Sequence, residues 1–421
     1  MPPPARDRSP RRTSAPRAAA RPLPPAAYLA LVLLCALSAP TQAQPAAPAR
    51  EPGSELEVYV MTMGQGDQIW ERFGHNGLGI RDRNAGTNLV YNWGVFRFSE
   101  ADFLPRFLRG EMRYSVEPYD ADLTAAYYQS INRSVSVQEL RLTPAQRVAI
   151  RDFVEWNARE ENKYYRYDYF GDNCSTRVRD VVDKALGGAL RSQFASRPSG
   201  RTFRDEARRL TEQDLLYTGI DIGLGSPSDR EMTQWEAMFI PMRLRDDLRE
   251  VRVAGPGGTT APLVSSERVL ISASRAGELA APANHQLRDL LIGLAIAALI
   301  MALAQAAPAA SRGVAATWCV VSGVLGLLLL GLWALTRHVW AYSNVNLLYF
   351  NPLWFVLAFM VARKVVPAAN ARRLAMLCAV LTVVGVVLGL LRWPQASEQV
   401  ALLVLAPHAA VLTLLYKRKA T

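Results

Sequence analysis

Cysteine and histidine are both scarce in this sequence, which holds four of each among 421 residues. Cys35 falls in an N-terminal targeting segment, and Cys319 and Cys378 fall in long apolar stretches, where cysteine usually acts as a small hydrophobic side chain. The polar part of the chain therefore holds only Cys174, which excludes an internal disulfide there. A single cysteine is also too little for a closed metal site, so we expect neither a metal centre nor a cofactor.

The N-terminus has the layout of a secretory signal peptide. Six arginines between Arg6 and Arg21 precede the apolar stretch Ala26–Ala39, which is short for a membrane span. Thr41-Gln42-Ala43 then offers small residues for cleavage. We expect residues 1–43 to be the signal peptide and 44–54 a linker; the alternative is an uncleaved anchor.

Long apolar runs are confined to the C-terminal part of the chain. Five stretches approach the ~20 residues that cross a bilayer, namely Leu290–Ala306, Val314–Leu335, Leu347–Ala362, Leu374–Leu391 and Val400–Tyr416. Positive charges gather in alternate loops, at Arg312, Arg363, Lys364, Arg372, Arg373, Lys417, Arg418 and Lys419, and the opposite loops hold only Arg337 and Arg392. This asymmetry predicts a bacterial inner-membrane protein whose N-terminal domain faces the periplasm.

The net charge of +11 does not indicate a nucleic-acid partner, because the six signal arginines and the loop residues account for much of it. No basic stripe with interleaved aromatic residues stands out in the polar part. We therefore expect a membrane partner and no nucleic acid.

The polar part predicts an α+β domain. Alternation from Leu56 to Met61 indicates a strand, and further strands are expected over Phe73–Ile80 and Leu89–Phe96. Helices should begin near Ser99–Asp102, at Asp120 and at Thr143-Pro144, where a capping threonine precedes a proline. We expect a periplasmic domain over 55–250, a linker or extra strands over 251–286, and five membrane helices over 287–417.

Cys174 lies in a sequence typical of a helix start. Val178, Val181 and Val182 continue a helical pattern after Asn173-Cys174, and Gly187-Gly188 ends it. A helix N-terminus favours thiolate over thiol, and its amides can hold an oxyanion. The alternative is a buried structural cysteine.

His75 is the one histidine expected inside the folded polar domain, at or just before a strand. A cysteine at a helix start and a histidine on a strand form the minimum set for an activated thiol nucleophile. Asn92 is the first choice for the group that orients the imidazole, and Glu71, Asp67 and Asp168 remain alternatives.

Gly64-Gln65-Gly66-Asp67, Phe73-Gly74-His75, Tyr91-Asn92-Trp93-Gly94 and Asn173-Cys174-Ser175-Thr176 resemble the Lnb N-terminal periplasmic domain family. The likeness covers about residues 55 to 416. It implies lipoprotein N-acylation with Cys174 as nucleophile, His75 as base, and Asn173, Asp67, Glu71 and Trp93 in binding or supporting roles. The His-before-Cys order also resembles the permuted papain-like acyltransferases, which implies that fold and a phospholipid or lipoprotein substrate.

The loop from Arg337 to Pro352 is rich in polar and aromatic residues at a predicted membrane edge. It resembles a segment of the same family, so His338 and Asn346 are candidates for substrate contact; the alternative is an interfacial aromatic belt. Two other functions stay open: a cysteine hydrolase, and a non-catalytic envelope binding module. The sequence leaves the oligomeric state and the identities of acyl donor and acceptor open.

Overall fold

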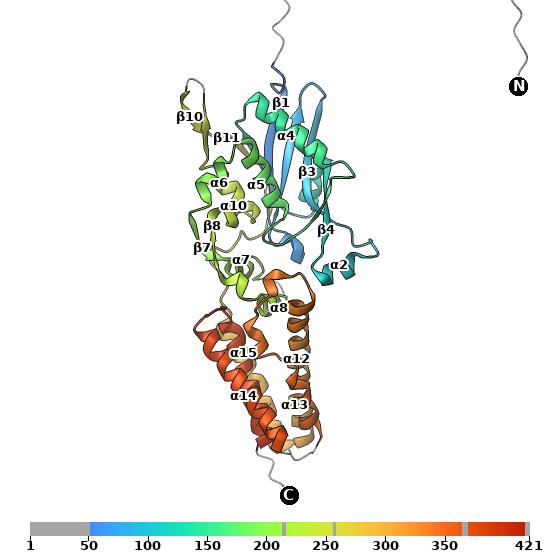
Figure 1. The fold of residues 1–421 in the computed structure, drawn as a ribbon, viewed down its shortest axis with the longest axis vertical. Coiled ribbons are helices and arrows are strands. Elements are labelled where there is room, and N and C mark those ends of the chain that lie inside the picture. The colour runs from blue at the N-terminus through green and yellow to red at the C-terminus, as the bar shows by residue number, and fades with distance from the viewer. Residues whose placement is uncertain (1–50, 213–215, 256–257, 364–368, 417–421) are drawn as a thin grey trace, which may run out of the picture. The chain divides into compact units, whose positions relative to one another are not determined.

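The computed structural model describes residues 51–212, 216–255, 258–363 and 369–416 (Figure 1). The predicted signal peptide and most of the 44–54 linker lie outside the described residues. The N-terminal part combines a sheet with packed helices, and the C-terminal part is helical throughout, as the α+β prediction requires.

A seven-stranded antiparallel sheet forms the centre of the N-terminal part, in the order β11-β5-β1-β2-β3-β4-β6. Its strands are β1 (Leu56–Met63), β2 (His75–Asp82), β3 (Thr87–Val95), β4 (Arg113–Asp120), β5 (Val135–Leu140), β6 (Tyr164–Arg166) and β11 (Val264–Ile271). The three strands expected first along the chain are β1, β2 and β3, within two residues at most ends.

Alternation along β1 places side chains on two covered faces. Val58 and Val60 join the core formed with α4 (Pro144–Asn157), α5 (Cys174–Ala185) and α10 (Pro241–Leu248). Tyr59 and Met61 face the other way, toward α3 (Ala121–Ser130). Because α5 packs against β2, the first residue of this helix reaches the same end of the sheet as the start of β2.

The predicted helix starts are confirmed. Thr143 caps α4 and accepts a hydrogen bond from the Gln146 amide, with Pro144 as the first helical residue. Asp120 caps α3, and Asp102 is the N-cap position of α2 (Phe103–Arg109).

The remaining polar-domain elements are short. They are η1 (Ile69–Glu71), α6 (Ala189–Phe194), β7 (Pro198–Thr202), α7 (Phe203–Leu210), α8 (Tyr217–Gly223), η2 (Ser226–Asp229), β8 (Glu231–Thr233), α9 (Gln234–Ala237), β9 (Arg252–Ala254) and β10 (Thr260–Pro262). Of the two options for residues 251–286, extra strands are present: β9 pairs with β10, and β11 extends the main sheet beyond β5.

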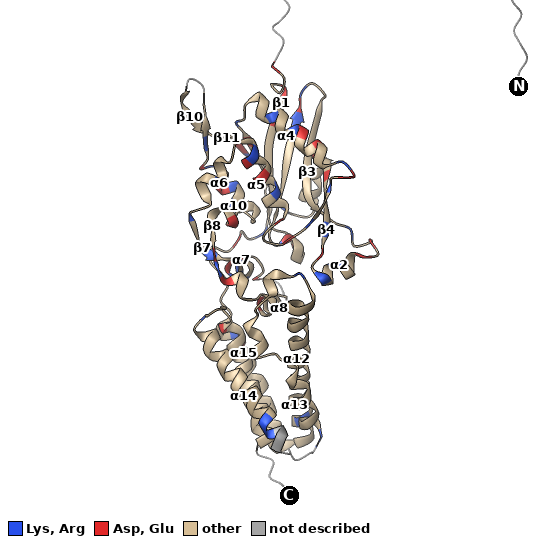
Figure 2. Cartoon of the chain, in the orientation of Figure 1, with Lys and Arg blue, Asp and Glu red and all other residues tan. Residues whose placement is uncertain are grey.

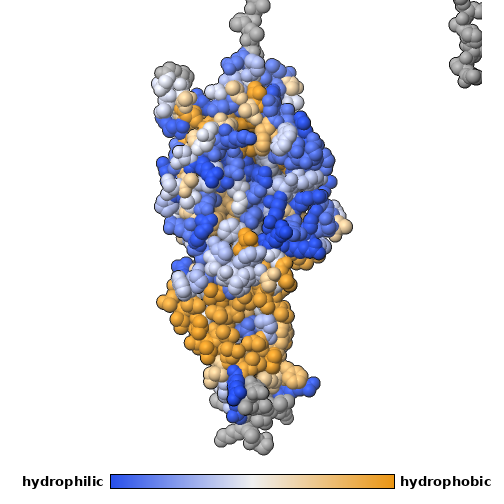
Figure 3. Space-filling view, in the orientation of Figure 1, coloured by the Kyte–Doolittle hydropathy of each residue, from blue (hydrophilic) through white to orange (hydrophobic). Residues whose placement is uncertain are grey.

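Five helical segments among the described residues are long and apolar enough to cross a membrane. They lie over Gln286–Ala306, Pro308–Leu335, Val345–Ala362, Arg372–Leu390 and Glu398–Tyr416, close to the predicted stretches. The helices are α11 (Gln286–Ala306), α12 (Pro308–Leu335), α13 (Leu353–Ala362), α14 (Ala369–Leu390) and α15 (Glu398–Tyr416), with η4 (Val339–Ala341) and η5 (Val345–Leu348) before α13. Figure 3 shows the apolar surface over these helices and a hydrophilic surface over the sheet domain.

Charged residues concentrate in the sheet domain and are sparse along the apolar helices (Figure 2). An exception lies at the junction, where Arg208 of α7 bonds Glu398 of α15 at 2.9 Å and the Ala396 carbonyl at 2.7 Å. Asn344 donates to the Ile222 carbonyl at the end of α8. These buried bonds fix the sheet domain on the helices.

Candidate active site

Asn173 places Cys174 at the first position of α5. Its side-chain oxygen accepts from the amides of Ser175 and Thr176 at 2.9 and 3.0 Å, and its amide nitrogen donates to the carbonyls of Tyr169 and Phe239. The sequence predicted that amides of this turn could hold an oxyanion. Those of Ser175 and Thr176 are already bonded to Asn173, so the expected donor of this turn stays a prediction for the amide of Cys174.

His75 opens β2 after a tight turn at Gly74, whose φ of +80° favours glycine. Its Nε2 lies 3.1 Å from Oδ1 of Asn92 on the neighbouring strand. Gly77 keeps this space open, since a Cβ there would stand 3.1 Å from the same Oδ1.

The Asn92 amide fixes the tautomer of His75. Its Nδ2 donates to the Val90 carbonyl at 2.9 Å, which turns Oδ1 toward the histidine. A carbonyl oxygen only accepts, so Nε2 of His75 carries the proton and donates. Nδ1 of the neutral ring is then the free base.

Asn76, the residue after His75, joins the start of β2 to the start of α5, where Cys174 lies. The backbone N–H groups of Asn76, Ser175 and Cys174 favour the thiolate of Cys174 and so lower the pKa of its thiol. The Asn76 side chain also donates to Ser175 Oγ at 3.0 Å, which ties β2 to α5. Tyr128 stacks on the His75 ring at 6.5 Å between centroids, and burial raises the pKa of the Tyr128 hydroxyl, which a thiolate on Cys174 would raise further.

Burial decides the protonation of both groups. It raises the pKa of the Cys174 thiol, against the lowering effect of the surrounding N–H groups and of Arg133. Burial, with a smaller contribution from Arg133, lowers the pKa of His75 to about 4. The amides at the helix start do favour thiolate, but burial outweighs them, so the pair rests as thiol and neutral imidazole.

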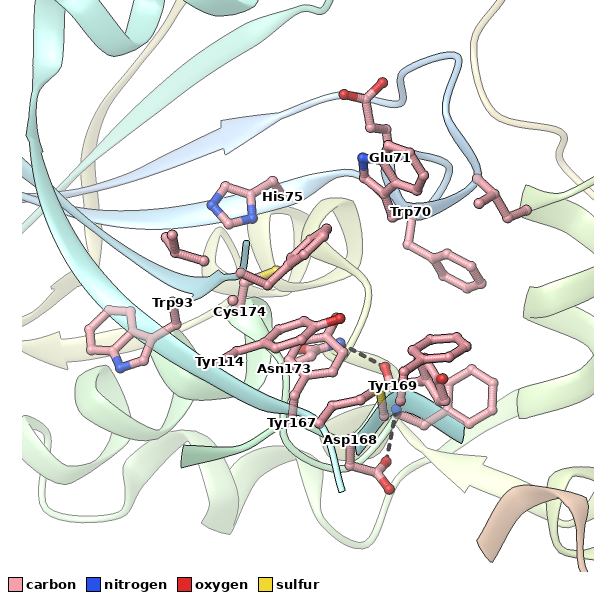
Figure 4. A pocket seen from close by; sticks show the side chains of 18 of the residues that line it. Trp70, Glu71, His75, Trp93, Tyr114, Tyr167, Asp168, Tyr169, Asn173 and Cys174 are labelled. Atoms are coloured by element: carbon pink, nitrogen blue, oxygen red, sulfur yellow. Dashed lines mark hydrogen bonds between the residues drawn. The ribbon is translucent and has the colours of Figure 1, made fainter. Parts of the chain in front are cut away.

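A cavity of about 1370 Å³ connects these residues to the membrane helices. His75, Asn92 and Cys174 lie on its wall, and aromatic side chains such as Tyr114, Tyr167 and Tyr169 line it (Figure 4). Its far end reaches Ile220 and Leu224 near α8, Leu332 of α12, and the loop at Arg337 and His338. An apolar space thus runs from the thiol to the end of a membrane-spanning helix.

Two family models match this chain. The Lnb N-terminal periplasmic domain matches residues 44–209, and the Lnb transmembrane domain matches residues 285–419. The chain belongs to the Lnb family. A search of curated proteins and a search of solved structures each find no match. As a member of the Lnb family, the protein is membrane-associated and has a periplasmic N-terminal domain.

Most site residues predicted from the sequence border the cavity: Cys174, His75, Asn92, Asn173, Trp93, Glu71 and His338. Asp67 and Asn346 are not among the lining residues. Exposed Asp67 pairs with Arg275 at 2.8 Å, and buried Asn346 donates to the Ile222 carbonyl at 2.9 Å. Neither therefore has the position for contact with a substrate in this space.

Several bordering residues have structural partners. Glu71 lies 3.4 Å from Arg133, and Trp93 donates through Nε1 to Asn157 at 3.0 Å. Asp168 accepts from the Trp340 indole at 2.8 Å. These contacts leave Asn92 as the predicted orienting residue that bonds His75.

Sequence reasoning missed Arg133 and Tyr128. Arg133 is buried, donates to the Gly64 carbonyl at 2.8 Å and lies 4.8 Å from the centroid of the Tyr128 ring. No motif marked either residue. Tyr167 and Tyr169 line the cavity, and the run of tyrosines in which they fall, just before Cys174, was a visible signal for an aromatic wall.

The described part of the Lnb-family chain contains no group of three or more His, Cys, Asp or Glu side chains placed to hold a metal ion.

Proposed function

We propose that this protein is an inner-membrane acyltransferase that moves a fatty acyl chain from a phospholipid ester, through a thioester on Cys174, to the N-terminal amine of a lipoprotein. The observation that carries the proposal is the position of Cys174 and the His75–Asn92 pair on the wall of an apolar cavity that reaches the membrane helices. The family match supports a periplasmic site above a membrane domain.

In the first step, Nδ1 of His75 takes the proton of the Cys174 thiol as the sulfur attacks the ester carbonyl carbon. The N–H groups of Asn76 and Cys174, which lower the pKa of the thiol, are the proposed donors for the negative charge that develops on the carbonyl oxygen. The C–O bond then breaks. The leaving alkoxide takes the proton from the imidazolium and departs as a lysolipid alcohol.

In the second step, the lipoprotein amine attacks the thioester carbon, and His75 takes a proton from the nitrogen. The C–S bond breaks as the amide forms, and the sulfur recovers the proton from the imidazolium. The cycle thus returns the thiol and neutral imidazole of the resting site. The role of Asn92 is to hold the Nε2–H tautomer throughout.

The cavity supports a long-chain acyl substrate. Small-molecule pockets commonly enclose about 300–1,000 Å³, and this space of about 1370 Å³ is larger and mainly apolar. Each methylene moved from water into such a space contributes about 0.8 kcal/mol. For a lipid already in the bilayer that gain is absent, and the cavity instead orients the ester at Cys174.

The test is the intact mass of the full chain in nanodiscs that contain isotope-labelled phospholipid. We expect one acyl adduct on the wild type and on Cys319→Ala, a control that removes a buried thiol from α12, and none on Cys174→Ala. Absence of the adduct from the wild type, or its persistence in Cys174→Ala, overturns the proposal.

A second measurement separates transfer from hydrolysis. A peptide with an N-terminal diacylglyceryl-cysteine is added to the acylated protein, and acyl-peptide and free fatty acid are quantified. Transfer predicts acyl-peptide and slow release of acid without peptide. Full-rate acid release without peptide would identify a hydrolase, and a binding module would form no adduct.

A further inference from the structure

An apolar surface surrounds α2 on the outside of the sheet domain. Phe98, Leu104 and Leu108 are 62%, 61% and 59% exposed, and Phe107 is also exposed. We call these four residues, together with exposed Trp70, the α2 surface. The Trp70 ring lies 5.5 Å from the Phe98 ring, and the Phe103 ring joins Phe98 to Phe107 at 5.0 and 6.2 Å between centroids. Large exposed apolar patches mark sites that contact a membrane or another protein.

Hydrogen bonds fix the α2 surface at the end of a membrane-spanning helix. α12 ends at Leu335, and the Arg337 amide then donates to the Arg109 carbonyl at 2.8 Å. His338 donates through Nε2 to the Phe107 carbonyl at 2.9 Å. α2 therefore lies where the bilayer that surrounds α12 must end.

Gly110 allows this close approach. A Cβ on Gly110 would stand 2.8 Å from the Arg337 carbonyl carbon and the His338 nitrogen, and its φ of +71° also favours glycine. The C-terminus of α2 thus rests directly on the backbone after α12. The position of the α2 surface relative to the membrane helices is consequently set by the backbone.

Neighbouring side chains match the composition of a membrane interface. Arg109 and Arg337 are exposed at the point where α2 meets α12, and Trp333 and Leu335 are exposed at the end of α12. Aromatic residues with flanking arginines are enriched at the headgroup level of bilayers. A short helix with exposed Leu and Phe beside basic residues suits insertion into the same layer.

The α2 surface also borders the cavity. Trp70, Phe98, Leu104 and Phe107 are exposed and line the space that contains Cys174. We infer that the α2 surface is embedded in the periplasmic-side lipid layer around α11–α15 and forms the entrance through which a lipid acyl chain passes from the bilayer to Cys174. The membrane contact stands by itself, and the passage of an acyl chain rests on the proposed function.

Lipid contact is tested by photo-crosslinking. Benzoylphenylalanine replaces Leu104 or Leu108, or Val269 as a control, which is 67% exposed on β11 of the sheet domain. The full chain in phosphatidylethanolamine–phosphatidylglycerol nanodiscs is illuminated and its adducts are identified by mass spectrometry. We expect phospholipid adducts at 104 and 108 and at least tenfold fewer at 269. Equal labelling at all three positions, no lipid adduct, or adducts with another copy of the chain overturns the inference.

The entrance is tested with Leu108→Glu, which changes the α2 surface at a residue that does not line the cavity. We expect a several-fold slower acyl adduct from bilayer phospholipid and an unchanged adduct rate from a water-soluble short-chain thioester. Equal rates from phospholipid in the variant and the wild type overturn the entrance. If the wild type forms no adduct while lipid crosslinks appear at 104 and 108, the proposed function fails and the membrane contact stands.

Discussion

Oδ1 of Asn92 accepts a hydrogen bond from Nε2 of His75, with 3.1 Å between the two atoms. Because Nδ2 of Asn92 is held by the Val90 carbonyl, the amide cannot rotate without losing a second bond. One asparagine on a neighbouring strand therefore determines which nitrogen of the imidazole is the base.

Replacement of Asn92 should lower the rate of acyl-adduct formation without removing it. In Asn92→Ala the imidazole loses its orienting partner but stays in place, and we expect a fall of about 10- to 100-fold, at or below the low end of the roughly 10²- to 10⁴-fold that a general base contributes. The measurement is single-turnover adduct formation by mass spectrometry at saturating lipid. Wild-type rates in Asn92→Ala would show that the bond does not position His75.

Asn92→Asp separates a positioning role from a structural one. The carboxylate retains the acceptor and adds a negative charge beside the ring, which favours the imidazolium. We expect the acid limb of the rate profile to shift to higher pH relative to wild type. A lower rate with an unmoved acid limb would indicate only structural damage.

The acid limb of the wild-type profile should lie well below the ordinary histidine value. Burial lowers the pKa of His75 to about 4, so the ring stays neutral and able to accept a proton at pH 5 to 6. We expect the second-order rate constant for adduct formation to fall only as the pH approaches about 4. A midpoint near 6.5 would contradict the buried, neutral base.

The stability of the folded chain should also depend on the protonation of His75. Because its pKa is lowered on folding, acid should destabilise the folded chain, whereas it would stabilise a histidine in a salt bridge. Between about pH 4 and 6.5 the unfolded chain binds a proton at residue 75 that the folded chain does not, so stability is lost as pH falls through this window. The check is the melting temperature in nanodiscs from pH 7 to 4. His75→Gln should flatten this dependence, and an unchanged slope would contradict the assignment.

The junction between the sheet domain and α15 should be sensitive to loss of one charge. Glu398→Gln leaves buried Arg208 without one of its carboxylates, and breaking such a pair costs about 3–5 kcal/mol. Glu250→Gln removes an exposed partner of Arg197 and is the matched control, expected to change stability by less than about 1 kcal/mol. The readout is thermal unfolding; equal effects of the two substitutions would contradict a buried junction.

Gly94 should be required both for its backbone conformation and for the space that it leaves beside Cys174. Its φ of +91° penalises any side chain by about 1–2 kcal/mol, and a new Cβ would lie 3.8 Å from the Cys174 Cβ and 3.6 Å from the Tyr167 ring. Gly200→Ala has the same kind of strain at a φ of +72° with open space around it. We expect both variants to be destabilised and only Gly94→Ala to slow adduct formation. Equal rates would show that the Gly94 contacts are irrelevant.

The sequence predicted those features that rest on local rules. Thr143-Pro144 begins a helix because capping and a fixed proline φ act within one turn, and the apolar runs give the membrane spans. The meeting of His75 with Asn92 followed from their expected strands, which pair in register near Leu78 and Tyr91.

Other features depend on distant contacts that periodicity does not encode. The thiol pKa was misjudged because the helix start suggested amide donors, whereas the enclosure by Tyr128, Tyr165 and Tyr167 is formed only after folding. Asp67 was an alternative for the residue that orients His75, but it pairs with Arg275 on a later segment. The permuted papain-like architecture and the catalytic roles stay predictions.

The bond between Arg208 and Glu398 joins two residues that lie 190 positions apart in the chain. During biosynthesis α7 emerges long before Glu398 is made, and until then the guanidinium of Arg208 has Asp221 as its carboxylate partner, at 2.8 and 3.0 Å. We therefore expect a chain truncated before residue 398 to hold its sheet domain less firmly on the membrane helices and to be degraded faster than a chain that includes α15. The order of synthesis thus delays this junction until α15 has been made.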